Sequence, residues 1–323
     1  MSKPKLAVYW AASCGGCDIA ILDIEEKILA VADFFDVVFW PCAFDFKYSD
    51  VEAMEDQSIT LTLFNGAIRS DENFHLAQLL RRKSVVLVAF GSCAAEGCIP
   101  GLANFYDKQS IMDYAFVKAP SLDNRNGVIP QPVTKVPEGE LHIPRLWNTV
   151  RTLPQVVDVD YVIPGCPPQS KQIAAVVEAV IDILQNGKPL PPKGTVLGAG
   201  DKSCCDECPR DRNIKKITKF FRPFEIEVDP KLCLMEQGIV CCGPATRSGC
   251  EAKCPSAGMP CRGCYGAPLN VHDQGAKMVS AVASVIDSTD PEEIEKIIGT
   301  IADPLGTFYR FSLADSFLRR VQR

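Results

Sequence analysis

The sequence lacks several features that would place it in common classes of protein. No apolar run reaches the roughly 18 residues needed to span a bilayer, so we expect no membrane segment. The opening residues, Met-Ser-Lys-Pro-Lys, contain neither a signal-peptide apolar core nor a twin arginine, and we therefore expect a cytoplasmic protein. Basic residues are not in excess, because 34 lysines and arginines face 40 aspartates and glutamates, for a net charge of -6. This balance argues against a general nucleic-acid binder, which needs basic surface to neutralise phosphates.

Histidine is also scarce, with 3 residues, whereas cysteine is abundant, with 16 among 323. The sequence around His75 and His272 favours surface or core roles over ligation, and His142 lies in a predicted loop. Thiols stay reduced in the cytosol, so a disulfide framework is a weak explanation for so many cysteines. Metal ligation is the better interpretation.

The first half of the chain alternates short, β-branched apolar runs with helical patterns, which is typical of a parallel sheet covered by helices. We expect an α/β, flavodoxin-like, doubly wound domain over residues 1–188, ending at a proline- and glycine-rich break that starts at Asn186. The predicted strands are Leu6–Trp10, Phe34–Trp40, Ile59–Phe64, Val85–Phe90 and Val159–Pro164, in the order 2-1-3-4-5, and the predicted helices are Asp18–Val31, Asp71–Arg82 and one from an N-cap at Ser170 to about Leu184.

Two regions show little regular pattern. Residues 118–154 are rich in Pro, Gly and Asn and are predicted to form an unusually long ordered loop. Residues 189–323 form the second predicted domain, cysteine-rich and largely irregular, with one clear helix at Pro291–Ile301. Ten of the 16 cysteines fall between Cys204 and Cys264. We expect metal binding to supply folding free energy there.

Four cysteines directly follow predicted strands: Cys14 and Cys17 the first, Cys93 the fourth and Cys166 the fifth. Because parallel strands share a carboxyl edge, these thiols should gather where cofactors bind. The small Asn65-Gly66 end of the third strand is expected to leave room for a cluster.

Four thiolates suit either a tetrahedral zinc or a [4Fe–4S] cube, and spacing alone does not separate the two. Ligands drawn from three distant segments favour a redox centre over a structural zinc. A thioredoxin-like dithiol is a weaker explanation for Cys14 and Cys17, since it would not require Cys93 and Cys166 at the same edge.

The later cysteines can supply two further ligand sets, one from residues 204–242 and one from residues 250–264. Their spacing departs from the bacterial ferredoxin run, so a plain ferredoxin domain is not the best description. Twelve ligands leave four spare cysteines, and spare cysteines are mostly small buried hydrophobes. These are Cys42, Cys98 and one of each adjacent pair, Cys204-Cys205 and Cys241-Cys242, for which the residues alone leave both choices open.

With these motifs the chain resembles the small subunits of nickel–iron hydrogenases across nearly its whole length. Cys14-Gly-Gly-Cys17, Gly-Ser-Cys-Ala at 91–94 and Pro-Gly-Cys-Pro-Pro at 164–168 are similar to the family's proximal-cluster motif. Cys233-Leu-Met-Glu-x-Gly followed by Cys242-Gly-Pro is similar to its distal-cluster segment, which places Cys241 at a ligand position. The resemblance implies three [4Fe–4S] clusters: proximal on Cys14, Cys17, Cys93 and Cys166, medial on Cys250, Cys254, Cys261 and Cys264, and distal on Cys205, Cys208, Cys233 and Cys241.

The chain also departs from many relatives in this family. Cys205 stands where they have histidine, which implies an all-thiolate distal cluster with a lower potential. Cys254 stands where many periplasmic relatives have proline and a [3Fe–4S] cluster, which implies a full cube. In these respects the chain resembles the F420-non-reducing (methyl-viologen-reducing) hydrogenases of methanogens. The resemblance also rests on an insertion between Cys233 and Cys241, on the absence of an export signal, and on residues 62–69, 141–146 and 306–311.

The resemblance implies an electron-relay subunit with no catalytic residues of its own. A nickel–iron site in a separate large subunit would oxidise H2, and electrons would pass from the proximal cluster through the medial to the distal one. The implied partners are that large subunit, a small iron–sulfur adaptor subunit and the heterodisulfide reductase of methanogenesis, with no nucleic acid and no membrane. Alternatives are the gamma subunit of an F420-reducing hydrogenase, the cluster-bearing quinone-reductase subunit of complex I, which lacks the ten-cysteine region, and a zinc-stabilised scaffold.

A run of basic residues surrounds the predicted distal ligands. It could steer an acidic acceptor protein, but we favour a solvated helix face. The residues are Lys202, Arg210, Arg212, Lys215, Lys216 and Lys219.

Overall fold

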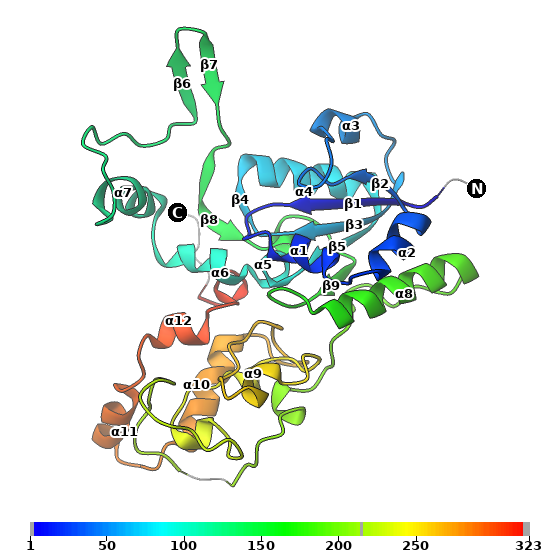
Figure 1. Cartoon of the computed structure of the whole chain (residues 1–323). Coiled ribbons are helices and arrows are strands. Elements are labelled where there is room, and N and C mark those ends of the chain that lie inside the picture. Colours follow the sequence, from blue (N-terminus) through cyan, green and yellow to red (C-terminus); the bar gives the residue numbers. More distant parts are fainter. Residues whose placement is uncertain (1–2, 214–215, 319–323) are drawn as a thin grey trace.

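The computed structural model describes residues 3–213 and 216–318 (Figure 1). Within these residues the N-terminal part is built on a five-stranded parallel sheet of order β2-β1-β3-β5-β9, which confirms the predicted 2-1-3-4-5 order. Its strands are β1 (Lys5–Trp10), β2 (Asp36–Phe39), β3 (Ile59–Asn65), β5 (Ser84–Phe90) and β9 (Tyr161–Ile163).

Helices cover both faces of this sheet. Side chains alternate along a strand, so Leu6 and Val8 of β1 enter one buried cluster, while Ala7 and Tyr9 enter the other. Burying a leucine or valine side chain such as Leu6 or Val8 stabilises the fold by about 1.5–3 kcal/mol relative to leaving it exposed. The first face packs against α1 (Gly16–Leu22), α2 (Lys27–Phe34) and α8 (Ser170–Asn186), and the second against α3 (Tyr48–Glu52) and α4 (Asp71–Lys83).

Two helix predictions in this half need correction. The helix predicted over Asp18–Val31 is two helices, because Glu25 adopts φ 59, which a right-handed helix cannot continue. The predicted N-cap at Ser170 is wrong by one residue. Gln169 is the N-cap, since its backbone is extended and its backbone N–H donates to Gln172 Oε1 at 3.3 Å.

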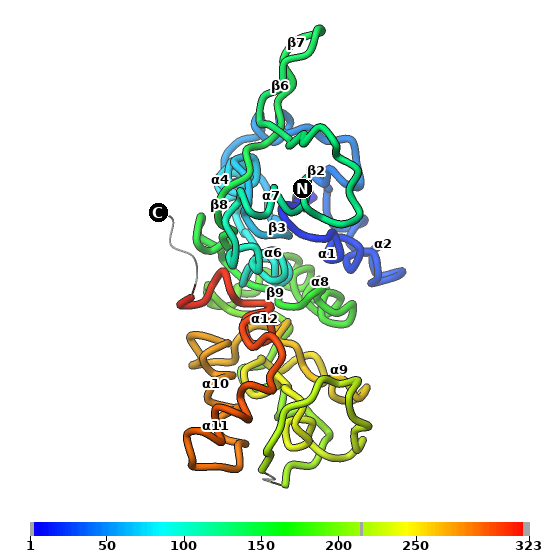
Figure 2. The backbone as a smooth tube through the Cα atoms, turned by 90° about the vertical axis from the view of Figure 1, so that its left-hand side faces the viewer, coloured from blue at the N-terminus to red at the C-terminus, as the bar shows by residue number. Residues whose placement is uncertain are grey.

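The long loop predicted over residues 118–154 is also wrong, because three strands lie within it. β6 (Val133–Val136) and β7 (Gly139–His142) form an antiparallel hairpin that projects from the molecule in Figures 1 and 2, and β8 (Leu146–Arg151) pairs with β4 (Ile68–Ser70). The hairpin is solvated on both sides, with Val133 47% and Leu141 58% exposed, so no inside–outside alternation marks it in the sequence.

The C-terminal part has a core of its own, assembled around cysteines and the helix α10 (Gln274–Val285). The sequence analysis missed α10 because its valines, serines and Gly275 are weak helix formers. The helix is stabilised instead by burial of Met278 and Val282 and by the side chain of Asp273, which caps its N-terminus. The helix predicted over Pro291–Ile301 is shorter than expected. The remaining helices are α5 (Ser92–Glu96), α6 (Cys98–Gly101), α7 (Lys108–Asp113), α9 (Lys253–Ser256), α11 (Pro291–Ile298) and α12 (Pro304–Phe308).

The last described segment returns to the N-terminal part and ties the two parts together (Figure 1). Ala314 packs so closely on Gly97 that a Cβ there would lie 2.4 Å from the alanine Cβ, and its carbonyl accepts a 2.8 Å bond from Gln155 Nε2. The two cysteine-bearing parts therefore form one contiguous body. None of the described helices has the length and apolarity to cross a bilayer.

Candidate functional site

The first four cysteines lie at the carboxyl edge of the sheet, as their positions after strands predict. The turns after β5 and β9 are bonded to each other, since Gly91 N donates to Ile163 O and Ser92 N donates to Gly165 O, both at 2.8 Å. This pairing brings Cys93 and Cys166 to the turn that carries Cys14 and Cys17. Gly91 lies so close that a Cβ there would be 2.4 Å from Cys17 Sγ.

The electrostatics of this group favour neutralisation by a cation or cluster. Burial raises the pKa of Cys17 well above its usual value, and the neighbouring thiols of Cys93, Cys166 and Cys14 raise it further. Several thiolates can share one site only when positive charge is bound among them. The group thus has the chemistry of a metal ligand set.

Gly66 lies where two backbone segments cross. A Cβ at Gly66 would lie 2.7 Å from the carbonyl carbon of Ala11, so the close approach of the two segments requires a glycine there. Its neighbour Asn65 donates to Asp18 Oδ2 at 2.6 Å.

Asp18, which sequence reasoning missed, is a buried carboxylate beside Cys17 that collects three donors. Besides Asn65, it accepts from Trp40 Nε1 at 3.0 Å and from Cys42 Sγ at 3.3 Å. Partial burial and the Asp18 contact raise the pKa of Cys42 to about 11. Cys42 is thus a thiol donor in a polar network.

The medial set, Cys250, Cys254, Cys261 and Cys264, is brought together in the C-terminal part. Burial raises the pKa of Cys264, and the charges of the other three thiols add to the effect. Cys264 also packs against a buried cluster that contains Cys93 of the first group, together with Cys98 and Phe311. The medial and proximal sets are therefore neighbours.

The distal set, Cys205, Cys208, Cys233 and Cys241, lines a small cavity of about 30 Å³. Burial raises the pKa of Cys205 to about 12, with Cys233 the next cause. The cavity is kept open by a small residue, because a Cβ at Gly243 would lie 2.9 Å from Cys205 Sγ.

The members of the two adjacent pairs have different surroundings. Cys241 lines the distal cavity. Cys242 points away from the cavity, and its Sγ donates to Thr307 O at 3.8 Å. Cys204 and Cys205 both line the cavity, and Cys204 Sγ also lies 4.0 Å from Cys250 Sγ of the medial set. The choice of Cys205 over Cys204 and of Cys241 over Cys242 stays a prediction.

Two of the spare cysteines contact predicted ligands, which no sequence signal indicates. Cys98 is fully buried with its Sγ 3.6 Å from Cys166 Sγ, and Cys204 is 1% exposed beside Cys250. Hydrogen bonds from these thiols lower the pKa of Cys166 and of Cys250. Ligands of one cube occupy separate corners, so sulfur atoms in contact are better described as donor and ligand than as two ligands.

The basic run does not form the solvated helix face that we favoured. The described residues of 202–219 contain no α-helix, and Arg210 is 7% exposed, donating to the carbonyls of Pro255, Asp229 and Leu232. Arg212 lines the distal cavity. Lys215 lies outside the described residues.

The residues present fit iron–sulfur clusters. Soft thiols in three sets of four are the donor set of [4Fe–4S] centres, and Gly91 and Gly243 form cradles that a Cβ would fill. In residues 3–213 and 216–318, no three Cys, His, Asp or Glu side chains lie close enough to share a single metal ion. A cube has a different requirement, because each of its thiolates binds its own iron atom.

Comparison with known proteins identifies the family of the chain. Residues 14–180 match the family described as NADH ubiquinone oxidoreductase, 20 Kd subunit. The F420-non-reducing hydrogenase iron–sulfur subunit of Archaeoglobus profundus is 40% identical, over 98% of each chain. The equivalent subunit of the F420-non-reducing hydrogenase of Methanothermobacter marburgensis is 37% identical, over 96% of this chain and 94% of the relative.

A solved [NiFeSe] hydrogenase structure from Dm. baculatum shares the fold. Its matching chain has a TM-score of 0.51 and 17% identity, covering 84% of this chain and 96% of that one. The chain thus belongs to the iron–sulfur subunits of F420-non-reducing hydrogenases, and it is an electron-transfer small subunit of a hydrogenase.

Proposed function

We propose that the chain holds three [4Fe–4S] clusters and relays electrons from H2 oxidation in a cytoplasmic complex. The observation that carries this proposal is the succession of three four-thiol sets from the sheet edge through the C-terminal part. When bound, the clusters would supply reversible one-electron chemistry. The proposed ligands are Cys14, Cys17, Cys93 and Cys166 (proximal), Cys250, Cys254, Cys261 and Cys264 (medial), and Cys205, Cys208, Cys233 and Cys241 (distal).

The chain's own residues bind, shield and tune these centres. Burial of Cys17, Cys93, Cys241 and Cys261 excludes water from at least one ligand of every set. A backbone amide also aims at sulfur, since Cys261 N donates to Cys241 Sγ at 3.3 Å. Such donors stabilise negative charge on sulfur and thereby raise the reduction potential.

The proximal edge supports docking of a large subunit with a nickel–iron site. A hydrogenase small subunit works with a large subunit, and the loop of exposed Cys14 is bordered by large exposed apolar side chains. Trp10 is 44% exposed, Ile19 58% and Phe44 51%. Burial of these side chains against a partner would also cover the proximal set.

Proposals for the acceptor side rest on family membership. We propose that a small iron–sulfur adaptor subunit docks near the distal set and passes electrons to heterodisulfide reductase, as part of methanogenesis. The division into domains 1–188 and 189–323 is likewise proposed, with support from separate buried cores in the two parts.

The test is isolation of the native complex under strict exclusion of oxygen, followed by metal and sulfide analysis and identification of the co-purifying subunits. We expect acid-labile sulfide sufficient for at least three cubes per chain, iron in excess of sulfide because of the nickel–iron site, and a large subunit containing nickel. Zinc in place of iron would establish the scaffold alternative. Co-purification of a flavin-bearing F420-reducing subunit would favour the alternative gamma-subunit assignment.

A further inference from the structure

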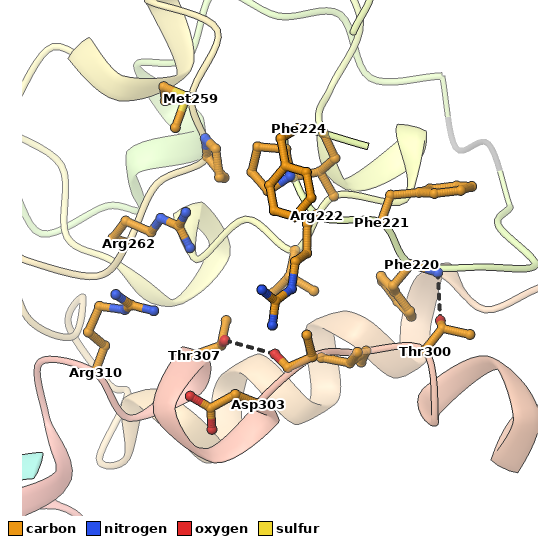
Figure 3. A pocket seen from close by; sticks show the side chains of 16 residues that line it. Phe220, Phe221, Arg222, Phe224, Met259, Arg262, Thr300, Asp303, Thr307 and Arg310 are labelled. Atoms are coloured by element: carbon orange, nitrogen blue, oxygen red, sulfur yellow. Dashed lines mark hydrogen bonds between the residues drawn. The ribbon is translucent and has the colours of Figure 1, made fainter. Parts of the chain in front are cut away.

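A large cavity in the C-terminal part lies outside the three cysteine sets (Figure 3). Its volume is about 500 Å³, within the range of about 300–1,000 Å³ that small-molecule sites occupy. Its lining comes from four segments of the chain: residues 220–224, residues 239–240, residues 259–260 with Arg262, and residues between 300 and 310. None of the twelve proposed cluster ligands lines it, so the proposed relay leaves the cavity without a role.

The charge in the cavity is mainly positive. Arg222, Arg262 and Arg310 line it, and Figure 3 shows their guanidinium groups directed toward the same hollow. In the part of the chain that the structure describes, none of the three forms an ion pair, and Arg310 Nε is buried with no hydrogen-bond partner. The one acidic side chain in the lining, Asp303, already accepts from Gly306 N at 3.0 Å.

One of these guanidinium groups has a buried donor without a partner, the Nε of Arg310, whereas Arg222 is exposed and Arg262 is half-buried. A buried charged donor without a partner is unfavourable, and a bound anion would compensate it. Arginine is also the side chain best suited to bind phosphate, because its planar fork donates two parallel hydrogen bonds. The cavity therefore favours a phosphate-bearing ligand.

The rest of the lining is apolar and favours a planar body on that ligand. Phe220, Ile239 and Val240 supply apolar wall, while Phe224 and Met259 remain 79% and 48% exposed. Arg222 stacks on Phe224, with its Cζ 6.0 Å from the ring centroid. A flat ring system could lie against these side chains and cover exposed apolar surface.

We propose that this cavity binds a mononucleotide-type ligand, a phosphate monoester joined to a planar ring system. The guanidinium groups of Arg222, Arg262 and Arg310 hold the phosphate, and the ring lies against the phenylalanine wall. None of the proposed cluster ligands lines the cavity, but Arg262 directly follows Cys261 and its charge acts on Cys254, so the site borders the medial set.

The experiment is equilibrium dialysis of the full-length, cluster-loaded chain against flavin mononucleotide, adenosine monophosphate, riboflavin and inorganic phosphate. We expect at least one mononucleotide to bind about ten times more tightly than both riboflavin, which lacks the phosphate, and phosphate alone. Arg222→Gln and Arg310→Gln should each weaken binding at least about tenfold. Arg222 is exposed over part of its surface, so its variant should fold even if the Arg310 variant does not.

The control is Arg125→Gln, an arginine outside the cavity that is 90% exposed and paired with Asp123. This change should leave the dissociation constant within about twofold. The proposal is overturned if neither mononucleotide binds, if riboflavin or phosphate binds as tightly, or if Arg222→Gln binds as the parent does. Changed cluster potentials without ligand binding would instead show that the arginines offset cluster charge, which also overturns it.

Discussion

Replacing Gly91 by alanine tests whether the turn after β5 is shaped around a cluster ligand. Gly91 has φ 82 and ψ 161, a region that is essentially restricted to glycine and costs about 1–3 kcal/mol for other residues. Its new Cβ would also lie 2.4 Å from Cys17 Sγ. The substitution therefore combines backbone strain with a direct collision.

The collision is large on the scale of metal ligation. Ordinary contact begins at 3.4 Å, so Cys17 Sγ must move by about 1 Å, the difference between 3.4 and 2.4 Å. Metal–ligand distances tolerate only about 0.2 Å. We expect Gly91→Ala to lose the proximal cluster, seen as about one third less iron per chain and loss of one electron paramagnetic resonance signal.

Two other glycines separate strain from collision. Gly127 has φ 60, and a Cβ added to it would meet nothing within 4 Å, so Gly127→Ala should cost about 1 kcal/mol of strain and no iron. Gly243 has no positive φ, but its Cβ would lie 2.9 Å from Cys205 Sγ, so Gly243→Ala should disturb only the distal signal. Full iron content and an unchanged spectrum in Gly91→Ala would refute the reasoning.

Three other substitutions test the cysteine sets and their surroundings. Cys98→Ala removes the thiol that lies 3.6 Å from Cys166 Sγ and should lower the reduction potential of the proximal cluster. The expected decrease is about 60 mV if the lost hydrogen bond favours the reduced state by about 1.4 kcal/mol. A redox titration in which the control Cys242→Ala shifts the proximal potential equally would contradict this. Cys254→Pro should leave the complex assembled but convert the medial cube to a three-iron form, and the absence of such a resonance would count against the grouping. Burial raises the pKa of Glu96 well above its usual range, so its contribution to stability is complete below the unfolded pKa of about 4.3 and is lost as the pH rises through the folded value. Glu96→Gln should therefore gain stability over the parent as pH rises in thermal unfolding, and an equal difference at every pH would disprove the assignment.

The sheet and its ligand edge could be predicted because they follow from chain direction. Parallel strands all end at the same edge of the sheet, so cysteines that directly follow strands meet at that edge. This holds whatever the exact bounds of the helices between the strands. The error at Glu25 therefore did not affect the predicted position of Cys17. The hairpin around Val133 could not be predicted, because a strand pair solvated on both faces has no hydrophobic alternation.

The sequence by itself determined the α/β architecture and the gathering of Cys14, Cys17, Cys93 and Cys166 at one edge of the sheet, because strand periodicity and the position of a cysteine after a strand are local properties. Only the tertiary structure decided that Cys98 and Cys204 contact predicted ligands, that Cys242 faces Thr307, and that three arginines from separate segments meet in one cavity. The physical reason is that irregular backbone has no fixed period. The direction of a side chain there depends on long-range packing, which residue order alone does not encode.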